Sequence, residues 1–274
     1  MKFLSSLLSL TLITTMAFSY NGEKVFQKVG KDSGAFVVKD LNTKQVIYSK
    51  DANQLVHPAS LTKIMTTIIA IESGRMNNIV TITPEMKNVQ PSIINFKVGE
   101  KFYLRDLVSA ALIKSANDAA NAIAIYLGNG DRDDFVDIMN WKAKKLGMMN
   151  THFENPCGFD SKNHKTTAND LVKLAEYAIK SGTFNSIVKQ NSYAITAINT
   201  RAVYRLHSSN KLLGKEKYVI GIKTGFTNQA GPCLIARAKK NDKDVLLVML
   251  NAGNRWPNAK IGRASCRERV YVLV

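Results

Sequence analysis

The stretch HPASLTKIMTTIIAIE, residues 57–72, joins a serine and a lysine to the most apolar helix expected in the chain. The helix is expected over residues 61–72, and because it has almost no polar face it should be buried. Pro58 favours an extended chain just before the helix. Ser60 and Lys63 lie three positions apart, so they share one face at the helix start. This stretch therefore predicts a central helix that holds a hydroxyl beside an amine.

The Ser60–Lys63 pair is suited to nucleophilic catalysis. A serine hydroxyl is a weak nucleophile until a base takes its proton. Lys63 can be that base only if its pKa falls well below the reference of about 10.4, which burial or a second nearby cation would cause. The alternative is a helix-capping serine beside a solvated lysine, a pattern that arises often by chance. The apolar surroundings make that alternative less attractive.

A second motif, KSAND at residues 114–118, lies in a turn between two expected helices. Ser115 could relay a proton to a leaving amine. Asn117 could hold both Lys63 and a substrate carbonyl. Plain capping of a helix by serine and asparagine is the alternative.

A third motif, GIKTGFT at residues 221–227, lies at the end of a strand-like run. Lys223 and Thr224 present a cation and a hydroxyl, which suit a terminal carboxylate. Gly225 has no Cβ, so a substrate backbone could lie beside the strand as an added strand. The alternative is an ordinary basic strand end.

The remaining pattern runs from strands through many helices and back to strands. The N-terminal strands over residues 35–38 and 45–48 form an expected hairpin. Strands near both ends are expected to pair in one antiparallel sheet with a helical insertion between them, an α+β or three-layer arrangement. The other expected helices are 104–113, 116–126, 133–145 and 167–179, and the other expected strands are 80–83, 191–198, 219–224, 233–238 and 245–250.

Composition sets the class of protein. A chain of 274 residues with 45% hydrophobic and 22% charged residues can bury a sizeable core, which excludes collagen, coiled coils and wholesale disorder. Its three cysteines are too few for a disulfide scaffold or a four-thiolate zinc site. The net charge of +17 favours polyanions. The export signal described below argues against nucleic acid as a partner. No basic helix interleaved with aromatic residues is present, so the charge is interpreted mainly as a solvated surface, with attraction to acidic wall polymers as a secondary effect.

The two ends are expected to stand apart from the fold. Residues 1–19 have the pattern of a cleaved export signal, with an uncleaved membrane anchor as the alternative. The protein is therefore expected in the periplasm or on the wall side of the cytoplasmic membrane. Residues 261–274 have no helical or strand period, and their back-translation resembles a sequencing adapter. We expect this tail to be non-native; a basic disordered tail is the alternative.

The three motifs together resemble the D-alanyl-D-alanine carboxypeptidases, the low-molecular-mass penicillin-binding proteins of the serine DD-peptidase family. The resemblance runs from about residue 36 to about residue 259 and includes SANDAA at 115–120 and THFENP at 151–156. It implies a β-lactamase/DD-peptidase-like fold, in which helices flank an antiparallel sheet and the active site lies between them. It also implies a catalytic domain over 20–260 that ends before the last helix of relatives, which leaves membrane association open.

The same resemblance implies the reaction. Ser60 would attack the penultimate D-Ala of a peptidoglycan stem peptide and form an acyl-enzyme, with Lys63 as general base. Ser115 would help to protonate the departing D-Ala, and Asn117 would position Lys63 and the substrate. No metal or organic cofactor is expected, and β-lactam antibiotics are expected covalent inhibitors.

The substrate would be held by the third motif. By resemblance, Lys223 and Thr224 would bind the terminal carboxylate, and Gly225 would lie along the substrate backbone. The N–H groups of Ser60 and Phe226 would form the oxyanion hole.

Departures from the family leave alternatives open. Cys157 and Phe159 stand where many relatives have His and Leu, which puts the efficiency of deacylation in question. Cys157 is expected to be a small buried hydrophobe, and its pairing with Cys233 stays open. A DD-endopeptidase on the same scaffold is the first alternative activity. A class A β-lactamase, with Glu154 as its base, and a non-catalytic wall-binding protein are the others.

Overall fold

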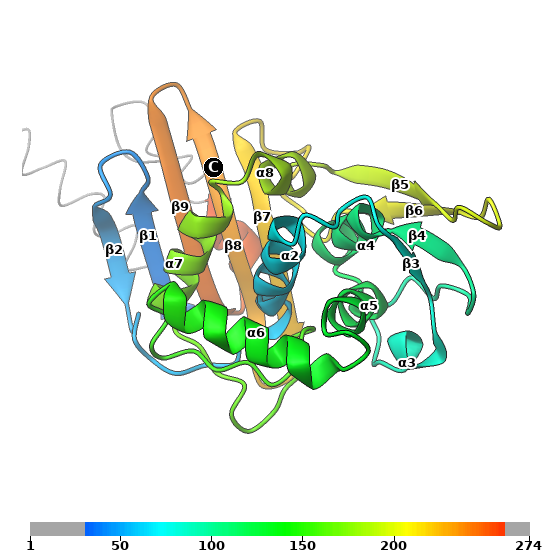
Figure 1. The fold of residues 1–274 in the computed structure, drawn as a ribbon. Coiled ribbons are helices and arrows are strands. Elements are labelled where there is room, and N and C mark those ends of the chain that lie inside the picture. The colour runs from blue at the N-terminus through cyan, green and yellow to red at the C-terminus, as the bar shows by residue number, and fades with distance from the viewer. Residues whose placement is uncertain (1–30, 261–274) are drawn as a thin grey trace, which may run out of the picture.

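The computed structural model describes residues 31–260, in which strands from both ends of the chain form one sheet (Figure 1). The strand order is β2-β1-β9-β8-β7, and every neighbouring pair is antiparallel. This confirms the predicted pairing of N-terminal and C-terminal strands. The strands are β1 (Ser33–Asp40), β2 (Val46–Lys50), β7 (Val219–Thr227), β8 (Gly231–Lys240) and β9 (Lys243–Ala252).

Strand β9 is buried on both faces because the sheet lies between two layers. Leu246, Val248 and Leu250 belong to the core shared with the helices. Their alternating neighbours Leu247 and Met249 belong to a second core on the opposite face. Successive side chains of a strand point to opposite faces, so a strand without a wet face needs a continuous apolar run.

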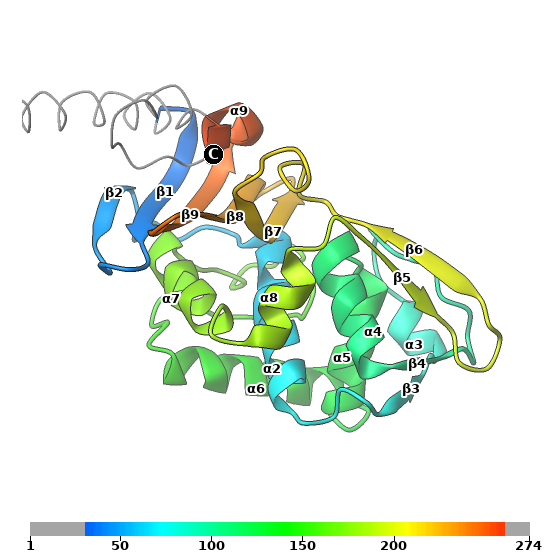
Figure 2. The ribbon, with the colours of Figure 1, turned by 90° about the horizontal axis from the view of Figure 1, so that it is seen from above.

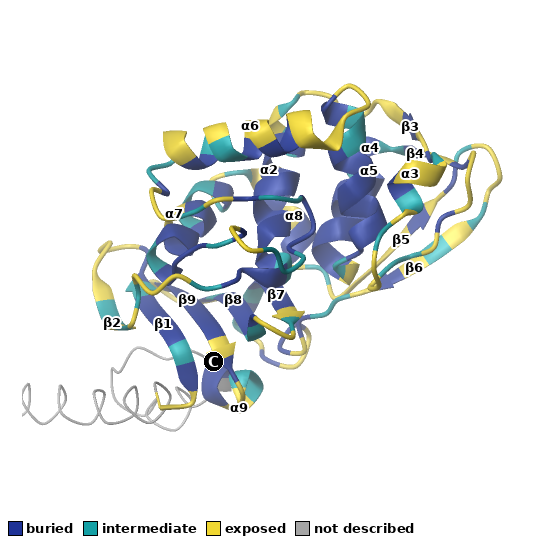
Figure 3. Ribbon diagram, turned by 90° about the horizontal axis from the view of Figure 1, so that it is seen from below, coloured by how far each residue is buried: buried dark blue, intermediate teal, exposed yellow. Residues whose placement is uncertain are grey.

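Helices from the middle of the chain cover one face of the sheet (Figure 1). Figure 3 shows α2 and α5 as buried, whereas α6 on the outside turns an exposed face to solvent. The predicted buried helix is confirmed, with a correction: residues 59–62 form a 3-10 turn and the α-helix begins at Lys63. The elements are η1 (Ala59–Thr62), α2 (Lys63–Glu72), α4 (Leu104–Ser109), the π-helical η2 (Ala110–Lys114), α5 (Asn117–Leu127), α6 (Arg132–Lys145), α7 (Ala168–Ala178) and α8 (Gly182–Val188).

A short helix, α9 (Arg255–Lys260), covers the opposite face of the sheet (Figure 2). Trp256 and Ala259 pack there against the second core, together with Leu212 and Leu213 from the loop before β7. The sheet is therefore the middle of three layers. This agrees with the sequence analysis, which predicted an α+β or three-layer arrangement.

Two small sheets extend the helical side. One pairs β3 (Ile79–Thr81) with β4 (Lys101–Tyr103), beside the one-turn helix α3 (Pro84–Lys87), and the other pairs β5 (Ser192–Thr196) with β6 (Val203–His207). Neither β6 nor α8 was predicted. Most β6 side chains are at least partly exposed, and α8 has only seven residues, so neither shows a clear hydrophobic period.

The predicted export signal and the predicted non-native tail both fall outside residues 31–260, the part that the structure describes. Within that part, no helix combines the length and the apolar character that crossing a membrane requires.

Replacing a core leucine of β9 tests the layered arrangement. Leu246 is fully buried beneath the helices, so Leu246→Ala should lower the free energy of unfolding by about 2–5 kcal/mol. Val46, on the edge strand β2, is 52% exposed, and Val46→Ala should change it by less than about 0.5 kcal/mol. Urea unfolding of both variants measures the difference. Equal costs would contradict the burial of β9.

Candidate active site

Ser60 and Lys63 meet at the junction of η1 and α2, at the edge of strand β7. The Lys63 Nζ atom donates a hydrogen bond to Ser60 Oγ at 2.9 Å. Ala59 has a positive φ of 50°, a strained conformation that turns the chain just before the serine. Lys63 is completely buried, while Ser60 faces the cleft. The structure therefore brings together the hydroxyl and the amine that the first motif predicted.

The Lys63 amine has two further acceptors. It donates to Asn117 Oδ1 at 2.7 Å and to the backbone carbonyl of Cys157 at 2.7 Å. Burial lowers its pKa from 10.5 to about 8, although the negative charge of Asp118 opposes that shift. A lysine with this pKa is neutral in an appreciable fraction of molecules near neutral pH, as a base must be.

The second motif is positioned by an irregular helix end. Helix η2 ends at Lys114, and the next residue, Ser115, has a left-handed φ of 65° and lines the cleft. The Asn117 amide nitrogen donates to the Gln90 carbonyl at 2.9 Å. That bond fixes the amide so that its oxygen faces Lys63. Asn117 is thus the side chain that links the second motif to the first.

Strand β7 brings the third motif to the same place. The Lys223 Nζ atom donates to Ser115 Oγ at 2.7 Å and to the Thr224 carbonyl at 3.0 Å. Burial lowers the pKa of Lys223 well below its usual value, and the charges of Lys63 and Arg255 lower it further. Three segments far apart in sequence therefore converge through their side chains.

The outer part of β7 lies against Ser60. A Cβ atom on Gly225 would come within 3.2 Å of the Ser60 nitrogen, so a larger residue would crowd this contact. Thr224 shares a hydrogen bond of 2.6 Å with the Ser209 hydroxyl. Phe226 is 59% exposed beside the cleft.

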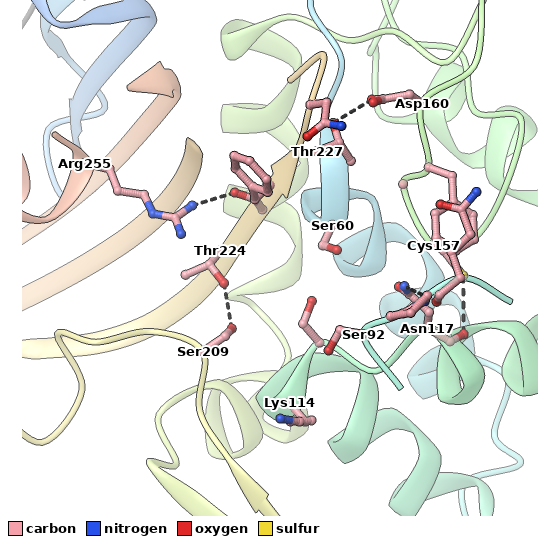
Figure 4. Close-up of a pocket in the computed structure, with 18 residues that line it drawn as sticks. Ser60, Ser92, Lys114, Asn117, Cys157, Asp160, Ser209, Thr224, Thr227 and Arg255 are labelled. Carbon is pink, nitrogen blue, oxygen red and sulfur yellow. Dashed lines mark hydrogen bonds between the residues drawn. The ribbon is translucent and has the colours of Figure 1, made fainter. Parts of the chain in front are cut away.

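The cleft has a volume of about 670 Å³ and lies between the helical region and the edge of β7 (Figure 4). All eight predicted residues line it or lie directly beneath it, and two of them, Lys63 and Lys223, are in the buried floor. The residues at the surface of the cleft are Ser60, Ser115, Asn117, Thr224, Gly225 and Phe226.

Sequence reasoning missed two charged side chains of the cleft. Arg255, from the start of α9, donates to the Gly225 carbonyl at 2.6 Å and to the Cys233 carbonyl at 3.0 Å. Asp160 accepts hydrogen bonds from the Thr227 hydroxyl at 2.6 Å and from the Gln229 N–H at 3.2 Å. Neither belongs to a motif, and each reaches the cleft only through tertiary packing.

The sequence analysis left open whether Cys157 and Cys233 form a disulfide. Both are free and buried in the structure. The Cys157 thiol donates to the Asn117 carbonyl at 3.4 Å, and burial raises its pKa to about 11. Cys157 is therefore buried, as expected for a small hydrophobic residue, and it forms no disulfide with Cys233.

Glu154, the base that a class A β-lactamase would need, points elsewhere. Its carboxylate bonds to the Ser161 hydroxyl and to the Asn163 amide groups within its own loop. It is not among the residues that line the cleft. The buried His164 accepts from the Glu154 N–H at 3.0 Å and burial lowers its pKa to about 4, so it stays neutral and supports the loop.

Nothing in residues 31–260 is arranged as a metal centre, since no three His, Cys, Asp or Glu side chains cluster to hold an ion. A cleft serine hydroxyl bonded to a buried lysine amine, beside the edge of a sheet, is the arrangement of a serine hydrolase in which a lysine can act as the base. Comparison with known proteins narrows this class. The profile of the D-alanyl-D-alanine carboxypeptidase family, peptidase S11, matches residues 23–254.

The chain belongs to this family, which confirms the predicted family and enzyme class. The D-alanyl-D-alanine carboxypeptidase DacF of Bacillus subtilis is 30% identical over 92% of this chain and 66% of the relative. The D-alanyl-D-alanine endopeptidase of Escherichia coli is 34% identical over 82% of this chain and 73% of the relative. The chain thus spans about two thirds of the length of these curated relatives.

Solved structures confirm the predicted fold class. The ampicillin-bound penicillin-binding protein D2 of Listeria monocytogenes superposes with a TM-score of 0.71 and 30% identity, covering 84% of this chain and 95% of the other. The fold is therefore that of the DD-peptidases, with the sheet and helices arranged as the resemblance implied.

Gly158 offers a test of how closely the loop after Cys157 packs on the turn at Ala59 and Ser60. Its φ is +89°, and a Cβ there would lie 1.8 Å from the Ala59 carbonyl oxygen. Gly147 has a φ of +71° and nothing within 4 Å of such a Cβ. Both alanine variants bear left-handed strain of about 1–2 kcal/mol. Gly158→Ala should lose a further ~1–3 kcal/mol of unfolding free energy from the clash. Equal losses in denaturant titrations would refute this packing.

Proposed function

We propose that the protein is a serine-type carboxypeptidase that removes the terminal D-Ala from peptidoglycan stem peptides through an acyl-enzyme on Ser60. The single observation that supports this most is the hydrogen bond between the Ser60 hydroxyl and the fully buried Lys63 amine. A solvated lysine would stay protonated and could not accept the serine proton. The family match then supplies the bond that is cut.

In the acylation step, neutral Lys63 takes the proton of Ser60 as the serine oxygen attacks the carbonyl carbon of the penultimate D-Ala. The carbonyl oxygen becomes an oxyanion, which the N–H groups of Ser60 and Phe226 would stabilise. Loss of one such donor typically costs about 2.7–4 kcal/mol of barrier. The close approach of Gly225 to the Ser60 nitrogen supports this proposal, because it brings the backbone of β7 next to the turn that contains Ser60.

The terminal carboxylate of the substrate would lie against Thr224, with Lys223 and Ser115 behind it. Lys223 is buried and its pKa is lowered, chiefly by burial. An arriving carboxylate supplies the opposite charge that favours its protonated form. The guanidinium of Arg255, bonded to the Gly225 carbonyl, adds positive charge on the same side.

The leaving D-Ala takes a proton as the C–N bond breaks. Ser115, whose hydroxyl is held at the floor of the cleft by Lys223, would help to pass to it the proton that Lys63 took from Ser60, which returns Lys63 to its neutral form. An ester between Ser60 and the acyl half remains. Water then attacks the ester carbonyl as Lys63 takes its proton. The bond between the acyl carbon and the serine oxygen breaks, and Lys63 returns the proton to that oxygen, which restores the Ser60 hydroxyl and frees the shortened peptide. None of these steps requires a metal or an organic cofactor.

A DD-endopeptidase is the second candidate, because curated endopeptidases are among the relatives and the same cleft geometry serves both reactions. The two differ in the leaving group, which is D-Ala in one and a cross-linked peptide in the other. A class A β-lactamase is disfavoured by the position of Glu154 within its own loop. A non-catalytic wall-binding protein would not need a buried lysine bonded to a cleft serine.

The proposal extends to inhibitors and location. β-Lactams imitate the substrate dipeptide and should acylate Ser60, and the ampicillin-bound relative supports this for the fold. Peptidoglycan lies outside the cytoplasm, so the protein should be exported, in line with the export signal predicted for residues 1–19. The boundaries of the catalytic domain at 20–260 stay a prediction.

Ser60→Ala tests the nucleophile. The variant should not be labelled by fluorescent penicillin and should release no measurable D-Ala from a diacetyl-Lys-D-Ala-D-Ala peptide, because among the described residues no other hydroxyl is bonded to the Lys63 amine. A Ser92→Ala variant, at another cleft serine, should keep its labelling. Labelling of the Ser60 variant, or its absence in the unaltered protein, would contradict the proposal.

The pKa of Lys63 predicts the pH dependence of acylation. Only the neutral amine accepts the serine proton, and its fraction rises as pH rises through about 8. The second-order rate constant for penicillin labelling should therefore climb about tenfold per pH unit below that value and level off above it. Labelling rates between pH 5.5 and 9.5 measure this. A rate that falls between pH 6 and 8 would exclude Lys63 as the base.

A further inference from the structure

One cation of the cleft is left unused by the mechanism above. Lys114, the last residue of η2, is exposed, lines the cleft and directly precedes Ser115. Within residues 31–260, no hydrogen bond or ion pair occupies its ammonium group. Figure 4 shows it at one end of the cleft, on the same side as Ser209.

Contacts place Lys114 beyond the site for the terminal carboxylate. The Ser209 hydroxyl is bonded to Thr224 at 2.6 Å, and the Ser209 N–H donates to the carbonyl of Ile113 at 3.1 Å. Ile113 is the neighbour of Lys114, so the order along this side of the cleft is Thr224, Ser209 and then Lys114. The opposite direction along β7 leads past Phe226 to Thr227, where the acyl half of a peptide would lie. Lys114 is therefore on the leaving-group side.

The charge at that end is not neutralised by the cleft itself. Asp160 is the only carboxylate among the described residues that line the cleft, and it lies at the other end, bonded to Thr227 (Figure 4). The leaving-group end holds cations alone, with Lys223 and Arg255 near the first carboxylate and Lys114 farther out.

We propose that Lys114 forms a subsite for a second negative charge on the leaving group. Free D-Ala has one carboxylate, which Thr224 and Lys223 bind, so it makes no use of Lys114. A leaving group with a second carboxylate, such as the acceptor peptide of an anionic cross-link, can place that carboxylate beside Lys114. This inference rests on the proposed function and adds a preference for anionic leaving groups.

The experiment compares two peptides with the same acyl half, diacetyl-Lys-D-Ala-D-Glu and diacetyl-Lys-D-Ala-D-Gln. D-Glu and D-Gln have nearly the same size and differ by one charge. The unaltered protein should cleave the D-Glu peptide with a kcat/KM about two- to fivefold higher, the range of an exposed ion pair. The ratio should approach one in Lys114→Gln, fall below one in Lys114→Glu, and shrink in 0.5 M salt.

Lys144→Glu is the matched control, because Lys144 is an exposed lysine of α6 that does not line the cleft. It makes the same change in net charge and should keep the ratio of the unaltered protein. A ratio near one in the unaltered protein, or one that Lys114→Glu leaves unchanged, would overturn the subsite alone. Penicillin labelling of each variant reports whether Ser60 is reactive. Absence of both labelling and cleavage would overturn the proposed function as well.

Discussion

The buried amine of Lys63 is the group on which both the fold of the site and its chemistry depend. Its three acceptors belong to separate parts of the chain, the turn at Ser60, the start of α5 at Asn117 and the loop at Cys157. A buried amine is stable only when its hydrogen bonds are made. None of these parts can therefore shift alone without leaving a polar group unsatisfied. The burial that requires these partners is also what lowers the pKa of the lysine.

This arrangement explains how the site accommodates a cysteine at residue 157, where the sequence analysis expected many relatives to have a histidine. What Lys63 uses there is the backbone carbonyl, which any residue supplies. The Cys157 thiol is turned to the carbonyl of Asn117, and its raised pKa keeps it neutral beside the lysine. The neighbouring Gly158, at a φ of +89°, packs where any side chain would strike the carbonyl of Ala59. The glycine and the carbonyl, rather than the side chain at residue 157, are thus the parts of this loop that pack against the turn at Ala59 and Ser60 and hold Lys63.

Much of the site was predictable because its chemistry is concentrated in three short motifs. Ser60 and Lys63 share a helix start, so their contact follows from spacing alone. The carbonyl of Cys157 has no signature in the sequence, since every residue has one. Arg255 and Asp160 reach the cleft from the end of the sheet and from a long loop, and only tertiary packing decides that. Prediction of the fold was limited in a similar way. Strong hydrophobic periods predicted the sheet and the central helix, but α8 and β6 have no clear period and were not predicted.

Two buried lysines in one cleft cannot both be protonated at low cost. Lys63 is bonded to Asn117 and Lys223 to Ser115, two residues away in the chain. Burial lowers the pKa of Lys223, and the charge of Lys63 lowers it further. In the proposed function, a substrate carboxylate near Thr224 would lie on the Lys223 side, so the proton would be best held by Lys223. Repulsion from that charge then favours the neutral form of Lys63. Binding of an anionic substrate would in this way place the charge where it holds the peptide and keep the base free to act on Ser60.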